Sequence, residues 1–98
     1  MSLKPSIALQ KHRDAIRHIV ARHRAANARV FGSVLEGTDH EGSDLDLLVD
    51  PTSETTLMDL GAIRLELRGL LGVEVDVLTP DAIPDNIRDQ LIRRARPI

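Results

Sequence analysis

Two short apolar runs, separated by a stretch of helical periodicity, constrain this fold more than any other feature. The runs cover residues 45–49 and 73–78 and are rich in leucine and valine, as buried strands are. Between them, Thr55 or Thr56 can begin a helix, and Gly72 stands where a helix commonly ends. A strand–helix–strand unit almost always crosses over in the right-handed sense with its strands parallel. The sequence therefore predicts a parallel pair of strands joined by one helix.

The helix expected between these runs has a clear apolar face. Thr56 with Asp59 resembles a capping box, although aspartate is a weaker partner there than glutamate. The apolar residues that recur at helical spacing are Leu57, Leu60, Ile63, Leu67, Leu70 and Leu71. We expect these side chains to face the sheet.

The rest of the chain supplies one more strand and two more helices. Residues 6–27 predict a helix and residues 28–33 a short strand, while residues 34–43 are polar and predict a loop with at most one helical turn. A last helix is expected over residues 83–94, before a basic tail. The stripe of the first helix consists of Leu9, Ile16, Ile19 and Val20. The order predicts an α/β (α+β) fold, a small three-stranded mixed sheet with helices packed on it, and the length of 98 residues suits a single domain over residues 1–98.

Three acidic residues lie near the points where the parallel strands begin. Asp44 and Asp46 are two residues apart, so their side chains point to the same face of the strand. Asp76 lies early in the next strand, and parallel strands begin at the same edge of a sheet. If the first strand runs antiparallel to the second, Gly32 and Ser33 at its end reach this edge as well. We therefore expect these residues to lie close together.

This set of residues suits a site for metal ions and phosphate. Crowded carboxylates repel one another, which raises one pKa unless a cation compensates. Mg²⁺ prefers oxygen ligands, and a third acid makes room for a second ion. Asp76 could bind that ion, accept a proton from an acceptor hydroxyl group, or do both. Gly32 would let the backbone approach a phosphate, and Ser33 would add a hydroxyl donor. Taken alone, a Gly-Ser pair is usually a turn and an Asp-x-Asp pair a solvated edge, so the prediction depends on their combination.

The composition limits the partners of such a site. Phe31 is the one aromatic residue, which leaves little for a base to stack on. The formal net charge of -2 predicts no bulk attraction to nucleic acid, so we expect no direct nucleic-acid binding. The absence of cysteine fits a cytoplasmic protein. No apolar run is long enough to span a bilayer and no signal peptide is visible, so we expect no membrane partner.

Gly32-Ser33, ten intervening residues and then Asp44-Leu45-Asp46 resemble the G-S-x10-D-x-D signature of the polymerase-beta-like nucleotidyltransferase superfamily. The short length resembles its minimal nucleotidyltransferase (MNT) branch. The resemblance implies that Asp44, Asp46 and Asp76 are the catalytic, Mg²⁺-binding acids and that Gly32 and Ser33 contact the nucleotide phosphates. It also implies a partner, because members of this branch commonly act as antitoxins to HEPN-domain ribonuclease toxins, and some transfer AMP from ATP to a toxin tyrosine.

One residue departs from the usual pattern of this branch. The loop often reads G-S-x-A-R-G, and here Glu36 stands in place of the frequent arginine. This change reverses a charge near the expected triphosphate.

Three functions follow from these residues and this resemblance. The first is an Mg²⁺-dependent enzyme, with two ions, that transfers a nucleotidyl group, AMP from ATP, to a hydroxyl group of a HEPN-type toxin. The second is a non-catalytic antitoxin with a vestigial site, which Glu36 favours. The third is a small-molecule, aminoglycoside-type nucleotidyltransferase, which commonly needs an acceptor-binding domain that 98 residues do not supply. A homo-oligomer and a hetero-oligomer both remain open.

Overall fold

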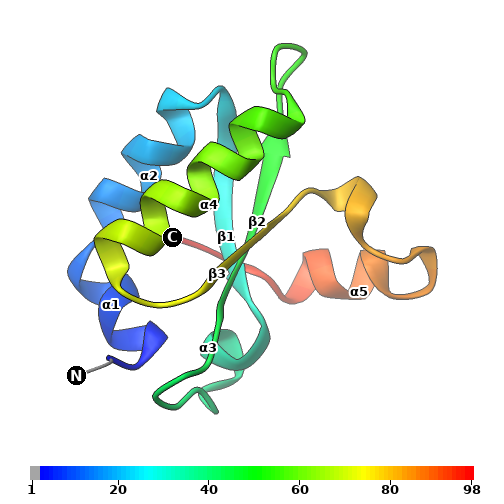
Figure 1. Ribbon diagram of the computed structural model, residues 1–98. Coiled ribbons are helices and arrows are strands. Elements are labelled where there is room, and N and C mark those ends of the chain that lie inside the picture. Colours follow the sequence, from blue (N-terminus) through cyan, green and yellow to red (C-terminus); the bar gives the residue numbers. More distant parts are fainter. Residues whose placement is uncertain (1–2) are drawn as a thin grey trace.

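A four-stranded mixed sheet forms the centre of the molecule in the computed structural model, which describes residues 3–98 (Figure 1). The strands lie in the order β3-β2-β1-β4. Strands β2 and β3 are parallel, and β1 is antiparallel to both β2 and β4. Their bounds are β1 (Ala25–Phe31), β2 (Leu45–Pro51), β3 (Val75–Leu78) and β4 (Arg96–Pro97). The predicted fold class, the parallel crossover and the antiparallel first strand are confirmed.

Strand β4 was not predicted from the sequence, so the expected three-stranded sheet has four strands. It contains two residues, Arg96 and Pro97, which pair with Val30 and Arg29 of β1. Proline is tolerated there because an edge strand leaves one side of its backbone unpaired. Such a short run has no periodicity to detect.

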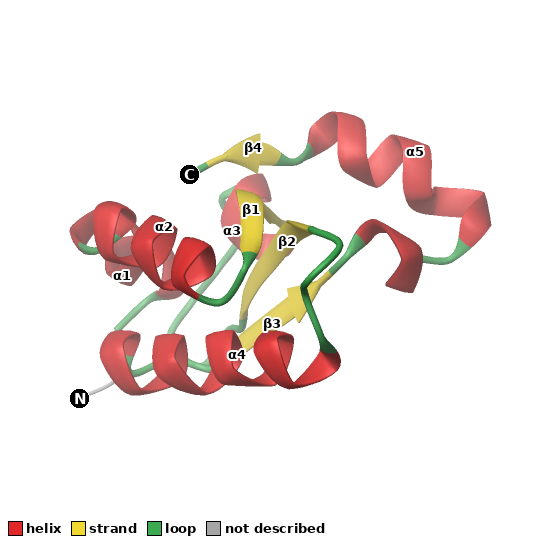
Figure 2. Ribbon diagram, turned by 90° about the horizontal axis from the view of Figure 1, so that it is seen from above, coloured by secondary structure: helices red, strands yellow, loops and turns green. Residues whose placement is uncertain are grey.

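Three of the helices cover one face of the sheet, and the last helix lies on the other side (Figure 2). The helices are α1 (Pro5–Lys11), α2 (Arg13–Arg22), α3 (Gly32–Glu36), α4 (Leu57–Leu71), the 3₁₀ turn η1 (Pro80–Ala82) and α5 (Asp85–Arg94). Helices α1, α2 and α4 bury their apolar sides against the sheet, whereas α5 contains no fully buried residue. Within residues 3–98, no helix combines the length and the apolar character that crossing a membrane requires.

Strand β2 divides its side chains between the two faces. Leu45, Leu47 and Val49 are fully buried among the helices, with Ile63 and Leu67 of α4 packed against them. The intervening residues of β2 point to the other face because side chains alternate along a strand. The helical layer therefore holds the main core, and the opposite face of β2 carries Asp46 and Asp50 on either side of the fully buried Leu48.

The first predicted helix is interrupted and shorter than expected. It breaks at His12 and ends at Arg22, so that β1 begins at Ala25 instead of residue 28. Arg24 has a positive φ of 65°, a left-handed conformation that ends a helix. The predicted apolar stripe is nevertheless buried as expected, and its members are Leu9, Ile16, Ile19 and Val20.

Helix α4 begins and ends as predicted, but some residues of its predicted apolar face do not pack against the sheet. The Asp59 amide donates to the Thr56 hydroxyl at 3.2 Å, and the Thr56 amide donates to the Asp59 carboxylate at 2.9 Å, which completes the capping box. Gly72 ends the helix in the left-handed conformation. Leu57, however, is 86% exposed and Leu70 is 41% exposed. Because apolar residues such as Met58 and Leu65 also lie on the outer side of α4, helical spacing alone does not identify the side that packs inward.

Candidate active site

Asp46 of β2 and Asp76 of β3 lie side by side at the edge of the sheet. The two strands are parallel, and these residues are partners in the register. Partners in adjacent strands lie about 4.8 Å apart and point to the same face. Both carboxyl groups therefore project from the face opposite the helical core, as the spacing of the acids predicts.

The surroundings of Asp46 disfavour its charged form. Burial is the largest cause, followed by the charges of Asp76 and Asp44 and a hydrogen bond with Asp76, and together they raise the pKa of Asp46 to about 6. Two of these causes are negative charges, which a bound cation would offset. The crowding of like charges is the electrostatic pattern that the sequence predicts for this edge.

The third acid is less tightly placed than the pair. Asp44 precedes β2 at the end of the loop and is exposed, and Asp76 is exposed as well. Among residues 3–98, no three histidine, aspartate or glutamate side chains converge closely enough to form a complete metal site. The hard oxygen donors of Asp46 and Asp76 nevertheless fit Mg²⁺, which commonly takes one or two carboxylates besides water and phosphate oxygens. The role of the three acids as metal ligands stays a prediction.

Gly32 brings the end of β1 against the same carboxyl group. Phe31 pairs with Asp46 in the antiparallel register, and Gly32 follows with a φ of +72°. A Cβ atom on Gly32 would lie 3.1 Å from Cγ of Asp46 and closer still to its Oδ2. Ser33 is the second residue of α3, and its carbonyl oxygen accepts a hydrogen bond from the Thr38 amide at 3.0 Å. The expected convergence of the first strand with the acids is confirmed, while phosphate contacts of Gly32 and Ser33 remain predicted.

Asp39 holds the loop that leads to Asp44, and sequence reasoning did not identify it. Its Oδ2 accepts a hydrogen bond from the Ser6 amide in the first turn of α1 at 2.9 Å. Burial raises the pKa of Asp39, but hydrogen bonds from Ser6 and from the Asp39 backbone, together with the charge of Lys4, lower the pKa overall. The two partners are separated by 33 residues, so no local pattern could have revealed this contact.

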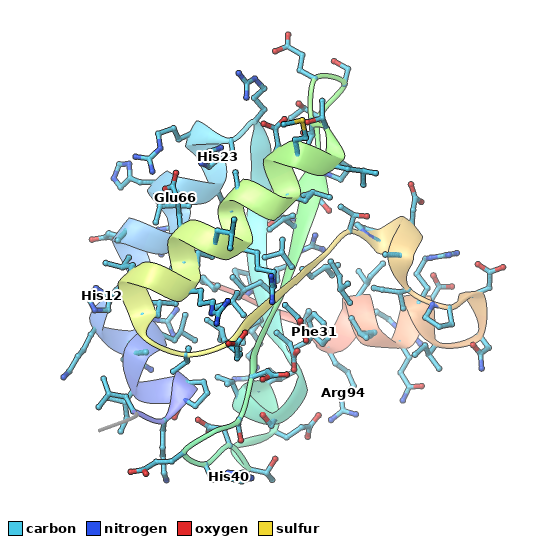
Figure 3. The ribbon with its side chains drawn as sticks, in the orientation of Figure 1. His12, His23, Phe31, His40, Glu66 and Arg94 are labelled. Carbon is cyan, nitrogen blue, oxygen red and sulfur yellow. The ribbon has the colours of Figure 1, made fainter. Side chains whose placement is uncertain are left out.

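A hollow of about 220 Å³ opens next to Gly32, between α3 and α5. Its apolar lining includes Phe31 and Leu91, and Glu36 and Arg94 form an ion pair across it. Figure 3 shows Phe31 and Arg94 in this part of the molecule, away from His23 on the helical side. The negative charge that Glu36 adds near the site is therefore paired with a cation from α5, which the sequence did not predict.

Comparisons with known proteins agree with this geometry. The profile of the family described as "Nucleotidyltransferase domain" matches residues 9–98. The chain is similar to "Putative protein adenylyltransferase MJ0435" of Methanocaldococcus jannaschii, with 36% identity over 79% of this chain and 83% of the relative. It is also similar to "Protein adenylyltransferase MntA" of Thermococcus cleftensis, with 33% identity over 65% of each protein.

Two solved structures share the fold. One, described as a "putative minimal nucleotidyltransferase", has a TM-score of 0.85 and 42% identity and covers 95% of both chains. The other, described as a toxin-antitoxin crystal structure with AMP-PNP, has a TM-score of 0.72 and 19% identity, and the match covers 86% of this chain and 69% of that one. At that identity the second likeness concerns the fold alone.

Proposed function

Because this chain belongs to the family of nucleotidyltransferase domains, we propose that it transfers AMP from ATP to a hydroxyl group of a partner protein. In this proposal, residues 1–98 act as a single minimal nucleotidyltransferase domain, Asp44, Asp46 and Asp76 bind Mg²⁺, and Gly32 and Ser33 contact the phosphates. The observation that carries the proposal is the in-register pair of Asp46 and Asp76 beside Gly32. The relatives named as protein adenylyltransferases support the choice of AMP and of a protein acceptor.

In this proposal each residue of the site has its own role in the reaction. Mg²⁺, when bound, would offset the charge of the phosphates and of the acids. Asp44 and Asp46 would hold this Mg²⁺, because carboxylates alone would repel a triphosphate. The acceptor hydroxyl oxygen attacks the α-phosphorus of the triphosphate. A bond forms between these atoms while the bond from the α-phosphorus to the pyrophosphate oxygen breaks. The hydroxyl proton passes to the carboxylate of Asp76, which is exposed at the rim of the site.

The acceptor in this proposal is a toxin of the HEPN type, and the outer face of α4 is its docking surface. Leu57, Met58 and Leu65 of this helix are large apolar residues that are 86%, 85% and 60% exposed. Apolar residues that are exposed together commonly mark a protein-binding site. A structural relative is described as a toxin-antitoxin complex, which supports a toxin as the partner.

The transfer reaction is tested with the protein and the partner that co-purifies with it. Incubation with ATP and Mg²⁺ should add one adenylyl group to the partner, measured by intact mass. Asp46→Asn should abolish this addition, whereas Asp89→Asn, a change at an exposed position of α5, should not. An unmodified partner, despite normal complex formation, would overturn the catalytic proposal.

The docking surface has its own test. Leu65→Glu should weaken binding of the partner at least tenfold without a change in the unfolding midpoint, because Leu65 is largely exposed. His18→Glu on α2 is the matched control, since it adds the same charge at an exposed position on another helix. Equal binding by both variants would exclude the outer face of α4.

A second candidate is a non-catalytic antitoxin, which the carboxylate of Glu36 beside Gly32 favours. In that case the double variant Asp44→Asn, Asp46→Asn would protect cells from the toxin as well as the original protein does. Loss of protection in the double variant, with the complex intact, would exclude this candidate and support catalysis.

A further inference from the structure

Glu36 and Arg94 join two elements that are far apart in the chain. Glu36 is the last residue of α3, Arg94 is the last residue of α5, and their side chains form an ion pair. Both side chains also line the hollow that Gly32 borders. The pair therefore shares this hollow with Gly32, one of the two proposed phosphate contacts.

This edge of the molecule is crowded with negative charge. Asp44, Asp46 and Asp76 gather near the strand ends, and Gly32, which abuts Asp46, borders the hollow that Glu36 lines with a further carboxylate. A nucleoside triphosphate would bring further negative charge to the same place. Within residues 3–98, Arg94 is the one cationic side chain that lines the hollow next to Gly32.

We propose that Arg94 is a substrate-positioning residue whose guanidinium group exchanges the Glu36 carboxylate for a phosphate oxygen of the bound nucleoside triphosphate. Glu36 then acts as an internal competitor that keeps nucleotide affinity low. The inference rests on the proposed function, since it requires a triphosphate at Gly32 and Ser33.

The exchange is physically reasonable because little holds the ion pair together. The side chains of Arg94 and Glu36 are 56% and 45% exposed, and ion pairs in water contribute little to stability. Helix α5 contains no fully buried residue, so the Arg94 side chain is not confined by packing. A guanidinium group can bind phosphate oxygens through two parallel hydrogen bonds, which is a stronger arrangement than one exposed carboxylate contact.

The test is ATP affinity, measured by titration calorimetry in Mg²⁺ without the acceptor protein. Arg94→Gln should weaken binding about tenfold or more, because a charge-assisted hydrogen bond is lost. Glu36→Gln should tighten binding about threefold, because the competitor is neutralised, and it should have no such effect in the Arg94→Gln background. Arg93→Gln is the control, since it removes a neighbouring exposed charge of α5 that does not line this hollow.

Opposite signs for the two single variants would support the inference. A merely structural ion pair would change affinity in the same direction in both variants, or in neither, and that result would overturn it. Unchanged unfolding midpoints would show that both variants fold. If the original protein binds ATP and Arg94→Gln binds it equally well, the inference fails alone; if the original protein binds no ATP, the proposed function fails with it.

Discussion

Gly32 and Asp46 approach each other so closely that no side chain fits between them. A Cβ atom at Gly32 would lie 3.1 Å from Cγ of Asp46 and closer still to its Oδ2, and the φ of Gly32 is +72°. We predict that Gly32→Ala displaces the Asp46 carboxyl group and lowers the transfer rate about a hundredfold, because small misplacements of reacting groups are costly. The backbone strain should also lower the free energy of unfolding by about 1–2 kcal/mol.

Gly37 provides a matched control for this prediction. Its φ of +75° imposes the same backbone strain on alanine, but no atom lies within 4 Å of the added Cβ. Gly37→Ala should therefore lose similar stability in denaturant titrations and keep its transfer activity. Equal losses of activity in both variants would show that strain, and not the contact with Asp46, decides the effect.

A second prediction concerns the free energy of unfolding without metal. The pKa of Asp46 is raised to about 6, so its charged form destabilises the folded state above that pH. Asp46→Asn should stabilise the protein at pH 8 in EDTA by on the order of 1–2 kcal/mol. A change of one pKa unit corresponds to roughly 1.4 kcal/mol for a fully buried group, and the partial exposure of Asp46 to solvent reduces this value. The gain should shrink as the pH falls through 6 and vanish below the ordinary value of 3.8.

Asp50 is the control for that prediction. It lies on the same face of β2 as Asp46, but its neighbour is a positive charge instead of other carboxylates. Its carboxylate pairs with Arg29 at 2.5 Å and accepts a hydrogen bond from Asn27 at 2.9 Å. Asp50→Asn should therefore destabilise the protein by about 1 kcal/mol or more. Urea unfolding measures the free energy of unfolding of both variants. A loss of stability in Asp46→Asn would contradict the expected repulsion between Asp46 and the neighbouring carboxylates.

A third prediction follows from the capping box of α4. The hydrogen bond from the Thr56 amide, with the charge of Arg24 as a further cause, lowers the pKa of Asp59. Its contribution to stability is therefore complete above the ordinary value of 3.8 and is lost as the pH falls through the lowered pKa. The difference in unfolding free energy between the original protein and Asp59→Asn should be constant from pH 8 to 5 and shrink at lower pH.

Thr56→Ala tests the other half of the same capping box. It removes the hydroxyl group that accepts the Asp59 amide and should cost about 1 kcal/mol at every pH. A pH-dependent cost in Thr56→Ala, or a pH-independent cost in Asp59→Asn, would show that the charge is not what stabilises this end of the helix.

The parts of the fold that the sequence predicted depend on local signals. Thr56, Asp59 and Gly72 identify both ends of α4 because a cap involves residues a few positions apart. With the helix bounded, the parallel order of β2 and β3 follows from the handedness of crossovers, and Asp46 and Asp76 become neighbours. The candidate site could be located from the sequence for this reason.

The features that escaped prediction depend on contacts between distant residues. The β4 strand is short and is defined by its partner β1, and Arg94 meets Glu36 across 58 residues. The exposure of Leu57 follows from how α4 is turned about its axis, and the sequence does not decide this because apolar residues lie on the outer side of the helix as well. The early end of α2 depends on the left-handed backbone conformation of Arg24. Arginine shows no preference for that conformation, so the sequence does not indicate it.

The last prediction concerns the loop that carries Asp44. Asp39 is buried in this loop and accepts the Ser6 amide of α1 at 2.9 Å, so it ties the loop to the helical layer. Asp39→Ala leaves that amide without its acceptor and should cost about 1–2 kcal/mol. Asp39→Asn keeps a neutral acceptor and should cost less. Because the pKa of Asp39 is lowered, the difference between the original protein and Asp39→Asn should shrink below pH 3.8.

We expect this hydrogen bond to limit the positions that Asp44 can take. Hydrogen exchange of residues 37–44 should accelerate in Asp39→Ala while exchange in β2 stays slow, because β2 is held by its own ladder on both sides. If Asp44 belongs to the metal site, Mg²⁺ affinity should fall in Asp39→Ala in proportion to the faster exchange, with Asp39→Asn intermediate. Faster exchange with unchanged Mg²⁺ affinity would remove Asp44 from the metal site and leave the in-register pair, Asp46 and Asp76, as its protein ligands.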